Sequence, residues 1–235
     1  MSGPSVSRSV PPVDRRRVRT ILGRLRKRFG ALEPPRRSGP LEELILTVLS
    51  QHTSDRNAER AFESLRGAFP TWDDVLAAST TDLTEVIRSG GLANIKAPRI
   101  QEILREIHER EGSWDVSWMR EATDEDVRAY LLSLPGVGPK TAAVVLAFAL
   151  GRDALPVDTH VYRVTRRLGL LPAGASAESA DRLLHELVPD GARAPLHVGL
   201  IRLGREMCKA GRPLCGACPL QDLCPSADPP AHGGA

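Results

Sequence analysis

The chain has 235 residues, of which 41% are hydrophobic, 4% aromatic and 26% charged, with a net charge of +3. This length and apolar content can bury one core or two small ones, and so few aromatic residues argue against the base-stacking surfaces of RRM and OB-fold proteins. The most apolar stretch, residues 141–150, is too short to span a bilayer, and the N-terminus lacks the apolar segment of a signal peptide. We therefore expect a soluble, cytoplasmic protein that does not bind membranes.

Basic residues are concentrated toward the chain ends. Residues 1–40 contain eleven Lys/Arg and two Asp/Glu, residues 41–153 contain twelve and nineteen, and residues 154–235 contain nine and eight. If both ends fold into one lobe, that lobe is basic and suits a polyanion such as nucleic acid. The alternative is a solvated arm, because charge runs usually face solvent. The arginines concerned are Arg15, Arg16, Arg17 and Arg19.

The pattern of apolar residues predicts an all-α chain with short connections. Residues 1–13 are rich in Ser, Pro and Val without helical spacing, which indicates a disordered tail. Beyond them, apolar residues recur every three or four positions between Gly, Pro and capping residues, and no segment alternates every second residue. The expected helices cover residues 18–29, 41–49, 58–65, 72–78, 83–88, 100–109, 123–134, 141–150, 159–168, 176–188 and 195–207.

The segment LPGVGPKTA at residues 134–142 predicts a glycine hairpin between two helices. Gly136 and Gly138 can adopt positive φ and leave backbone amides uncovered at a helix N-terminus, where the amides and the helix dipole favour a phosphate. Such a hairpin would hold one DNA phosphate without reading the base sequence. A simple turn between helices is the alternative, and a short Gly-x-Gly taken alone favours that explanation.

Lys140 and Asp158 are the candidate catalytic residues. Lys140 follows the hairpin at a helix N-terminus, where the positive end of the dipole disfavours an ammonium and favours a neutral, nucleophilic amine. Asp158 follows Pro156 and precedes a predicted helix, where an ordinary N-cap is the usual role of Asp. A Lys nucleophile and an Asp facing one pocket are what glycosidic cleavage through a Schiff base needs. Each residue taken alone favours its structural explanation.

The four cysteines form a single C-x6-C-x2-C-x5-C run, which indicates one shared site. Disulfides do not suit a cytosolic protein, and a structural zinc site usually shows two separated C-x2-C pairs where this chain has one. A compact loop with four thiolates suits a cubane iron-sulfur cluster better, although the spacing alone leaves zinc open. The ligands would be Cys208, Cys215, Cys218 and Cys224.

The hairpin, the lysine, the aspartate and the cysteine run together resemble endonuclease III, within the helix-hairpin-helix glycosylase superfamily. The matching stretches are LPGVGPKTA at 134–142, VDTHVYRV at 157–164 and GLANIKA at 91–97, together with the cysteine run. The resemblance spans residues 20–225, and this conjunction of motifs is far more specific than any one of them.

The resemblance implies an all-α, two-lobed helix-hairpin-helix glycosylase fold with a cleft between the lobes. A six-helix barrel domain would cover residues 39–153, with the helix-hairpin-helix motif at 125–150. Both chain ends, residues 14–38 and 154–228, would form an iron-sulfur cluster domain. This is the pairing of chain ends that the charge distribution favours.

The resemblance also implies an activity and a cofactor. The chain would be a bifunctional DNA glycosylase and abasic-site lyase that removes oxidised pyrimidines, acting as a monomer on double-stranded DNA with a damaged base or an abasic site. Lys140 would attack C1′ of a nucleotide flipped out of the duplex. Asp158 would stabilise the developing oxocarbenium charge and assist proton transfer. The four cysteines would hold a structural [4Fe-4S] cluster.

Further residues would contact DNA by the same resemblance. Leu92 would wedge between bases, with a core position as the competing explanation. In this family a Gln within a Ser-Ala-Gln-Ala-Thr-type stretch fills the hole that the flipped nucleotide leaves. This chain reads Ser-Gln-His-Thr at the same place, and ungapped matching aligns His52 with that Gln. Gln51 and His52 therefore both stay candidates. Pro139 stands where relatives often carry a basic residue. The remaining implied contacts are Gly136, Gly138, Thr141, His160, Lys209 and Arg212.

Two other functions stay open. The first is a monofunctional mismatch or uracil-type glycosylase, which Lys140 argues against because those relatives usually replace the lysine. The second is a non-catalytic iron-sulfur DNA-binding protein or electron carrier. A covalent adduct with abasic DNA, dependent on Lys140, would separate the lyase from both.

Overall fold

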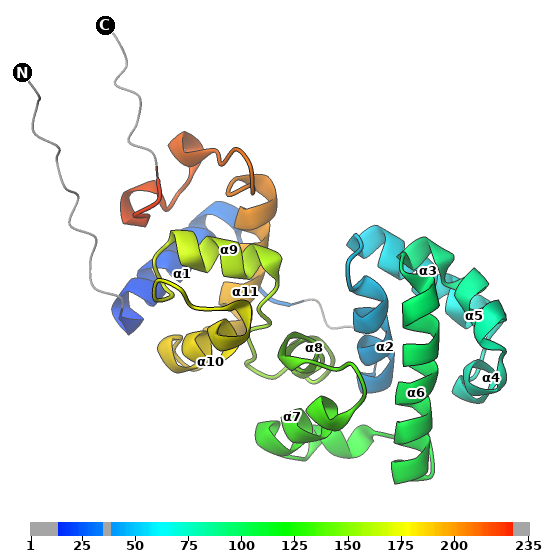
Figure 1. The fold of residues 1–235 in the computed structure, drawn as a ribbon. Helices are drawn as coiled ribbons and strands as arrows, with labels where there is room; N and C mark the ends of the chain where they lie inside the picture. Colours follow the sequence, from blue (N-terminus) through cyan, green and yellow to red (C-terminus); the bar gives the residue numbers. More distant parts are fainter. Residues whose placement is uncertain (1–13, 35–38, 228–235) are drawn as a thin grey trace, which may run out of the picture. The chain divides into compact units, whose positions relative to one another are not determined.

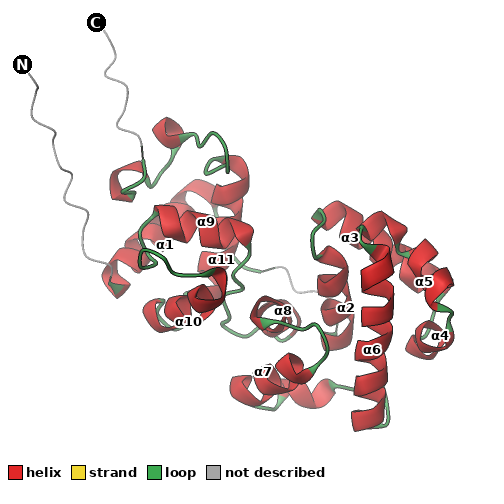
Figure 2. Ribbon diagram, in the orientation of Figure 1, coloured by secondary structure: helices red, strands yellow, loops and turns green. Residues whose placement is uncertain are grey.

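The computed structural model describes residues 14–34 and 39–227, so the predicted disordered tail at residues 1–13 lies outside the described residues. Figure 2 shows that the regular elements in the described ranges are helices, without a strand. The chain divides into two compact units. The first unit consists of the residues up to Pro34 and from Asp153 onward, and the second unit is Pro35–Arg152. The sequence predicted these divisions after residues 38 and 153.

The first unit combines segments from both ends of the sequence (Figure 1). The apolar faces of its helices form one core, against which the half-buried Cys208, Cys218 and Cys224 pack. Gly199 brings two of these helices close together, because a Cβ there would lie 3.0 Å from Leu25 Cδ1. The elements are α1 (Arg15–Phe29), α9 (Thr159–Arg167), α10 (Ala177–Leu187), α11 (Arg193–Glu206), η4 (Cys215–Ala217) and η5 (Gln221–Leu223).

Arg17 is part of this fold rather than of a solvated arm. It lies on the inner face of α1 and is 4% exposed. Its Nη2 donates to Leu168 O at 2.6 Å and to Leu223 O at 2.8 Å. Two helical turns further on, Arg24 donates to Pro219 O at 3.2 Å and pairs with the carboxylate of Asp222. The solvated-arm explanation is therefore wrong for Arg17, whose guanidinium ties α1 to the segment that carries the cysteines.

The second unit is continuous in sequence. Its long helix α6 packs against α2, α4 and α5, and α6 continues through Pro98 instead of starting after it as predicted. No described helix is long and apolar enough to cross a membrane. The elements are α2 (Pro40–Ser50), α3 (Asp55–Ala68), α4 (Trp72–Ala77), α5 (Thr80–Val86), η1 (Arg88–Gly90), α6 (Ala93–Glu111), η2 (Ser117–Arg120), α7 (Asp124–Ser133), α8 (Pro139–Val144) and the π-helical turn η3 (Val145–Ala149).

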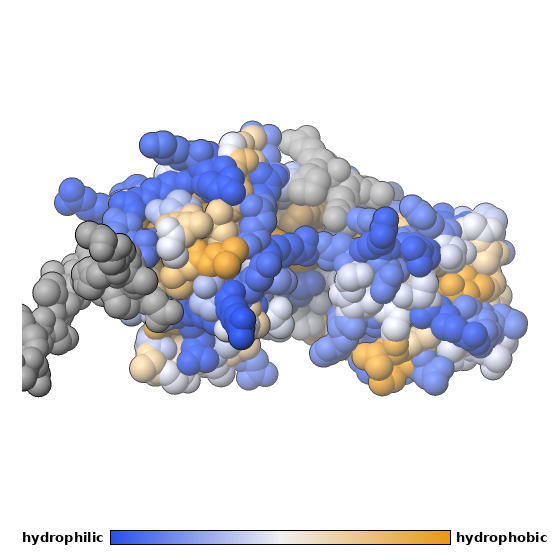
Figure 3. All heavy atoms as spheres, turned by 90° about the horizontal axis from the view of Figure 1, so that it is seen from above, coloured by the Kyte–Doolittle hydropathy of each residue, from blue (hydrophilic) through white to orange (hydrophobic). Residues whose placement is uncertain are grey.

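The face in Figure 3 is mostly hydrophilic and carries separate hydrophobic patches. The large apolar side chains that are exposed within the described residues are Leu92 at 51%, Ile95 at 63%, Leu132 at 40% and Leu214 at 50%. Two of these four flank the start of α6, only three residues apart. Single exposed apolar side chains need no explanation, but a pair on one short segment does.

Candidate active site and metal centre

The predicted glycine hairpin joins α7 to α8 in the second unit. Leu134 and Val137 are 2% and 6% exposed and anchor the turn, whereas Gly136 is exposed with φ 71°. Arg99 of α6 lies over the hairpin, because a Cβ placed on Gly136 would be 2.4 Å from Arg99 Nη1. The turn therefore presents backbone and a guanidinium on one surface, which suits an anion.

Lys140 is the second residue of α8 and is half-buried. Gly138 is the N-cap of this helix and Pro139 occupies its first turn, as the sequence predicts. Thr141 is 3% exposed, so the residue is buried in its unit and little of it is open to the predicted phosphate contact. The buried residues that follow fix α8 in the unit and hold Lys140 at the end next to the hairpin.

Replacing Gly136 with Ala should weaken binding to duplex DNA. A side chain at φ 71° costs on the order of 1 to 2 kcal/mol, and the new Cβ must displace the Arg99 guanidinium. We expect Kd for a duplex with an abasic-site analogue to rise roughly tenfold, which corresponds to about 1.4 kcal/mol. Fluorescence anisotropy at fixed salt measures this change.

Gly151→Ala is the matched control in the same unit. Gly151 has φ 68°, and a Cβ there would meet nothing within 4 Å. It therefore carries a similar backbone strain away from the hairpin. Equal affinities of the Gly136→Ala and Gly151→Ala proteins would contradict a role of the hairpin in DNA binding.

Asp158 is the N-cap of α9 in the first unit. Its Oδ1 accepts a hydrogen bond from the Val161 amide at 2.7 Å, so the structural role foreseen for this residue is present. The side chain is half-buried. Because the cap bond holds one carboxylate oxygen, it also fixes the direction of the whole carboxylate, which a positioned catalytic acid requires.

Helix α11 holds the segment that leads to Asp158. Asp153 Oδ1 accepts from the Arg193 amide at 2.9 Å, at the start of this helix. His197, one turn further along, is 4% exposed, and its Nδ1 lies 2.8 Å from Pro156 O. Since the acceptor is a carbonyl, Nδ1 carries the proton. Sequence reasoning did not identify Asp153 or His197, because both act on backbone groups.

His160 lies on the first turn of α9 and is half-buried. Arg163 Nη2 lies 3.0 Å from His160 Nδ1, and because a guanidinium can only donate, Nδ1 is the acceptor. A Cβ at Gly204 of α11 would lie 3.0 Å from His160 Cβ, so the two helices clamp the ring. The ring is thus oriented by contacts within its own unit.

The candidates for insertion into DNA belong to two segments of the second unit. Gln51 is the half-buried C-cap of α2, and His52 after it is exposed with φ 54°. Leu92 is the N-cap of α6, has φ 49° and is 51% exposed. The competing explanation of Leu92 as a core residue does not agree with this exposure. Both exposed residues are strained, since side chains rarely adopt positive φ.

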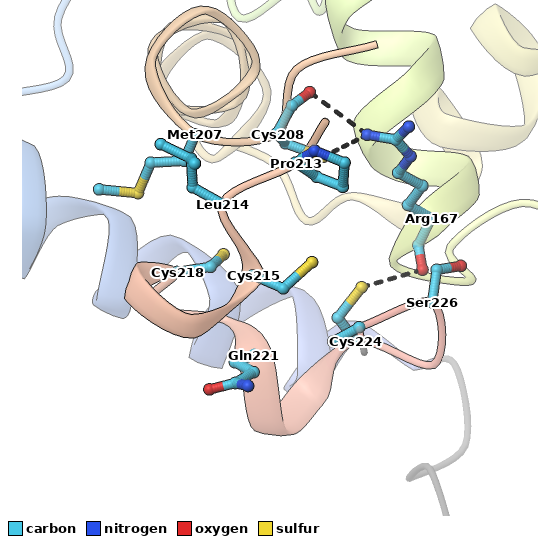
Figure 4. A pocket seen from close by; sticks show the side chains of 11 residues that line it. Arg167, Met207, Cys208, Pro213, Leu214, Cys215, Cys218, Gln221, Cys224 and Ser226 are labelled. Carbon is cyan, nitrogen blue, oxygen red and sulfur yellow. Dashed lines mark hydrogen bonds between the residues drawn. The ribbon is translucent and has the colours of Figure 1, made fainter. Parts of the chain in front are cut away.

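The four cysteines line one pocket with about 350 Å³ of empty space, part of it open to solvent. Figure 4 shows their side chains around this pocket, carried by the loop after α11 and by the turns η4 and η5. Burial raises the pKa of the Cys218 and Cys224 thiols, and the charges of the neighbouring cysteines raise it further. Four thiolates in this pocket therefore need a compensating positive charge, such as that of a bound metal centre.

Arg167 at the end of α9 organises the rim of the pocket. Its Nη1 donates to Lys209 O at 2.7 Å, and its Nη2 donates to Ala210 O at 2.8 Å. Nη1 also lies 3.3 Å from Cys208 Sγ (Figure 4). Its own carbonyl accepts from Cys224 Sγ at 3.2 Å. One residue thus contacts the first and the last cysteine of the run, a role that no motif in the sequence reveals.

Lys209 and Arg212 lie on the loop between Cys208 and Cys215, and both are exposed. Arg167 holds the backbone of this loop from the inside, through Lys209 O. The loop therefore presents two positive side chains on a supported backbone, as expected for phosphate contacts.

Replacing Arg167 with Met should loosen the cysteine pocket. The change removes the donors to Lys209 O and Ala210 O and leaves these carbonyls without this partner. We expect the visible absorbance of the iron-sulfur centre to bleach severalfold faster in the presence of a chelator. Arg166→Met is the control, because the guanidinium of Arg166 stacks on Tyr162 at 5.6 Å instead; equal bleaching rates would contradict this role of Arg167.

Comparison with known proteins identifies the family. Residues 45–190 match the model of the HhH-GPD superfamily of base excision DNA repair proteins, and residues 208–224 match the iron-sulfur binding domain of endonuclease III. Endonuclease III of Thermotoga maritima is 37% identical over 185 residues, which cover 79% of this chain and 82% of that protein. The chain belongs to the endonuclease III family.

Two further relatives bear on this family assignment. A "putative DNA glycosylase" of Arabidopsis thaliana is 38% identical over 165 residues, which are 70% of this chain but only 56% of the plant protein. The structure of a trapped covalent intermediate between endonuclease III and DNA has a TM-score of 0.79 at 32% identity, covering 92% of this chain and 97% of that one. These matches confirm the predicted all-α, two-lobed helix-hairpin-helix glycosylase fold.

The family also settles the general class of activity. Endonuclease III proteins are DNA glycosylases with abasic-site lyase activity, so the predicted type of enzyme is confirmed. The match over residues 208–224 confirms an iron-sulfur binding domain on the predicted cysteine run. The solved relatives in complex with DNA support DNA as the binding partner.

Proposed function

We propose that this member of the endonuclease III family is a bifunctional glycosylase and lyase that removes oxidised pyrimidines from duplex DNA. The observation that carries the proposal is the position of Lys140, the second residue of α8 and directly behind the glycine hairpin. An amine at this place can act as a nucleophile on a nucleotide whose phosphate the hairpin holds. The similarity to an endonuclease III trapped covalently on DNA supports the same chemistry here.

The proposed reaction begins with attack of the neutral Lys140 amine on C1′ of an extrahelical nucleotide. The new C1′–N bond replaces the glycosidic bond, whose electron pair leaves with the base, and the base takes up a proton. The Asp158 carboxylate stabilises the positive charge that develops on the sugar and relays the proton released by the amine. Its fixed orientation as the N-cap of α9 suits this task.

The sugar then opens to a Schiff base with Lys140, which makes the C2′ proton acidic. Loss of this proton breaks the C3′–O bond by β-elimination, and the strand is nicked 3′ to the lesion. Hydrolysis of the Schiff base releases the enzyme. Base removal and strand cleavage thus share one covalent intermediate, which is why a single lysine accounts for both activities.

We assign the DNA contacts to four surfaces. The hairpin would bind a phosphate through Gly136, Gly138 and the backbone of Thr141. Leu92 would wedge between bases, while Gln51 or His52 fills the space left by the flipped nucleotide. His160 would contact the DNA beside Asp158. The loop residues Lys209 and Arg212 would meet phosphates.

We further propose that the four cysteines hold a [4Fe-4S] cluster with a structural role. A zinc ion needs its ligands about 2.3 Å from one point, and within the described residues no three potential ligands converge in this way on a single metal ion. Four thiols spread around one larger pocket support a multi-iron centre instead. Bound there, the cluster would neutralise the thiolates and brace the Lys209 loop.

The remaining proposals concern organisation and place of action. Residues 39–153 would be the six-helix barrel domain, with the helix-hairpin-helix motif at 125–150. Residues 14–38 and 154–228 would be the iron-sulfur cluster domain. The enzyme would act as a monomer in the cytoplasm, at the nucleoid if its source is bacterial.

Borohydride trapping tests the proposal. A duplex with one abasic site, incubated with the purified protein and borohydride, should become covalently attached to the protein, and peptide mapping should find the adduct on Lys140. Duplexes with single defined lesions should be cleaved when the lesion is an oxidised pyrimidine. Base release without an adduct would point to a monofunctional glycosylase, and binding without either would point to a non-catalytic protein. Iron and sulfide analysis should give four of each per chain.

A further inference from the structure

Lys96 of α6 is buried directly beneath the two segments that carry His52 and Leu92. Its side chain is 3% exposed. Its Nζ donates to Leu49 O at 2.6 Å and to Gly90 O at 2.7 Å. The first acceptor is three residues before His52 and the second is two residues before Leu92, so one amine ties the bases of both segments together.

The first of these bonds completes the C-terminus of α2, where four backbone carbonyls lack partners within the helix. Ser50 Oγ donates to Thr47 O, and the Gln51 amide donates to Val48 O. The Thr53 amide donates to Ser50 O at 3.4 Å. Leu49 O is the remaining carbonyl, and Lys96 is its partner. A cation at the C-terminal end of a helix is also favoured by the helix dipole.

The two segments are immediate neighbours. A Cβ at Gly90 would lie 3.7 Å from Leu49 O, and a Cβ at Gly91 would lie 4.0 Å from Thr53 Oγ1. Helix α3, which follows the first segment, also packs against η1, which precedes the second. The two exposed segments therefore form one continuous surface, with Lys96 below it.

Backbone strain is concentrated on this surface. His52 has φ 54° and Leu92 has φ 49°, and they are the non-glycine residues with positive φ in the described part of the chain. Such conformations persist only where the surrounding structure holds them, and they gather at functional sites. The bonds from Lys96 Nζ hold the backbone three residues before His52 and two residues before Leu92, so one side chain restrains both strained segments.

The same surface carries an apolar prong, formed by Leu92 at 51% exposure and Ile95 at 63%. The Ile95 and Lys96 amides both donate to Leu92 O at 3.0 Å, so the prong is built on the first turn of the helix that contains Lys96. Apolar side chains that enter a base stack must be held rigidly, since the duplex resists unstacking. The prong therefore needs a fixed base.

We propose that Lys96 is a positioning residue that locks the His52 segment and the Leu92 prong into one rigid wedge for insertion into duplex DNA. This inference rests on the proposed function, because it concerns how the enzyme opens a duplex. Burial lowers the pKa of Lys96 to about 8, so the side chain is still mostly an ammonium at neutral pH. A charged donor strengthens both bonds to the carbonyls.

Lys96→Met tests the proposal, because Met keeps the length of the side chain and removes both bonds. Two substrates separate the wedge from the chemistry: an abasic site in duplex DNA, which needs insertion, and one in single-stranded DNA, which does not. We expect the single-turnover lyase rate on the duplex to fall about tenfold or more, as for other small misplacements of a site. The rate on single-stranded DNA should stay within about twofold of the wild type.

Gln101→Met is the matched control. Gln101 lies on the same helix, is 6% exposed, and its Nε2 donates to two backbone carbonyls, those of Val75 and Ala78. Gln101→Met therefore removes a similar buried hydrogen-bond donor, but one that does not contact the His52 and Leu92 segments. Lys96→Gln serves as a milder second variant if Lys96→Met does not fold. Iron content and circular dichroism report folding in each case.

The outcomes distinguish the possibilities. A loss on duplex DNA alone, in the Lys96 variants and not in Gln101→Met, supports the wedge. Equal losses in the Lys96 and Gln101 variants, or equal losses on both substrates, overturn it and leave Lys96 a purely structural residue. If the wild-type protein cleaves neither substrate, the proposed lyase function is wrong, and the wedge inference that rests on it is overturned with it.

Discussion

Lys140→Gln should leave a folded protein that binds damaged duplex DNA and cleaves none of it. Gln is a good helix former, so α8 should persist, but an amide cannot attack C1′ or form a Schiff base. We expect strand cleavage to fall by about 10⁴-fold or more, as when other enzymes lose their nucleophile. Borohydride should trap no adduct. Single-turnover gels on duplexes with an abasic site or an oxidised pyrimidine measure both effects.

The control is Lys27→Gln, in the last turn of α1, where Lys27 is exposed. This protein should be trapped as efficiently as the wild type. If Lys140→Gln still forms a borohydride adduct at the wild-type rate, another amine is the nucleophile. The assignment of Lys140 would then have to be abandoned, while the fold and the family would stand.

Asp158→Asn should separate the charge of this residue from its structural role. Asn is as good an N-cap as Asp, so the bond to the Val161 amide can persist and α9 should be unchanged. The negative charge that stabilises the oxocarbenium-like transition state is lost. We expect base removal to slow by about 10² to 10⁴-fold, the usual range for such groups. Single-turnover release of the damaged base provides the measurement.

Asp14→Asn is the matched control, because Asp14 caps α1 through the same kind of bond, to the Arg17 amide at 2.8 Å. Its activity and stability should equal those of the wild type. Asp158→Ala would in addition remove the cap and cost about 1 kcal/mol of stability. Wild-type rates for Asp158→Asn would show that the carboxylate is only a cap.

Much of the fold could be predicted because the helical spacing of apolar residues agreed with the Gly, Pro and capping residues that mark the helix ends. The helix that follows Asp158 is an example, since the predicted helix 159–168 agrees with α9 at Thr159–Arg167. The start of α6 could not be predicted, because Pro98 signals a break and the structure tolerates it within the helix. The π-helical turn after α8 leaves no pattern in the sequence either.

The candidate site could be predicted only where it consists of motifs. The hairpin, Lys140, Asp158 and the cysteines occur at characteristic spacings, so they are visible in the sequence. Lys96, Arg167 and His197 are not, because each of them bonds backbone carbonyls that belong to other segments. A carbonyl is present at every residue, so no spacing of side chains records such a contact.

The contact between Arg17 and Leu223 has a consequence for how this protein is made. The two residues are 206 positions apart, and they join the first helix to the turn that ends the cysteine run. A ribosome that adds about 5 to 20 residues per second needs roughly 10 to 40 seconds to cover that distance. During this interval the second unit, which is continuous, can already mature. Helix α1 gains its helical partner α11 only late in synthesis, and the bond to Leu223 forms later still.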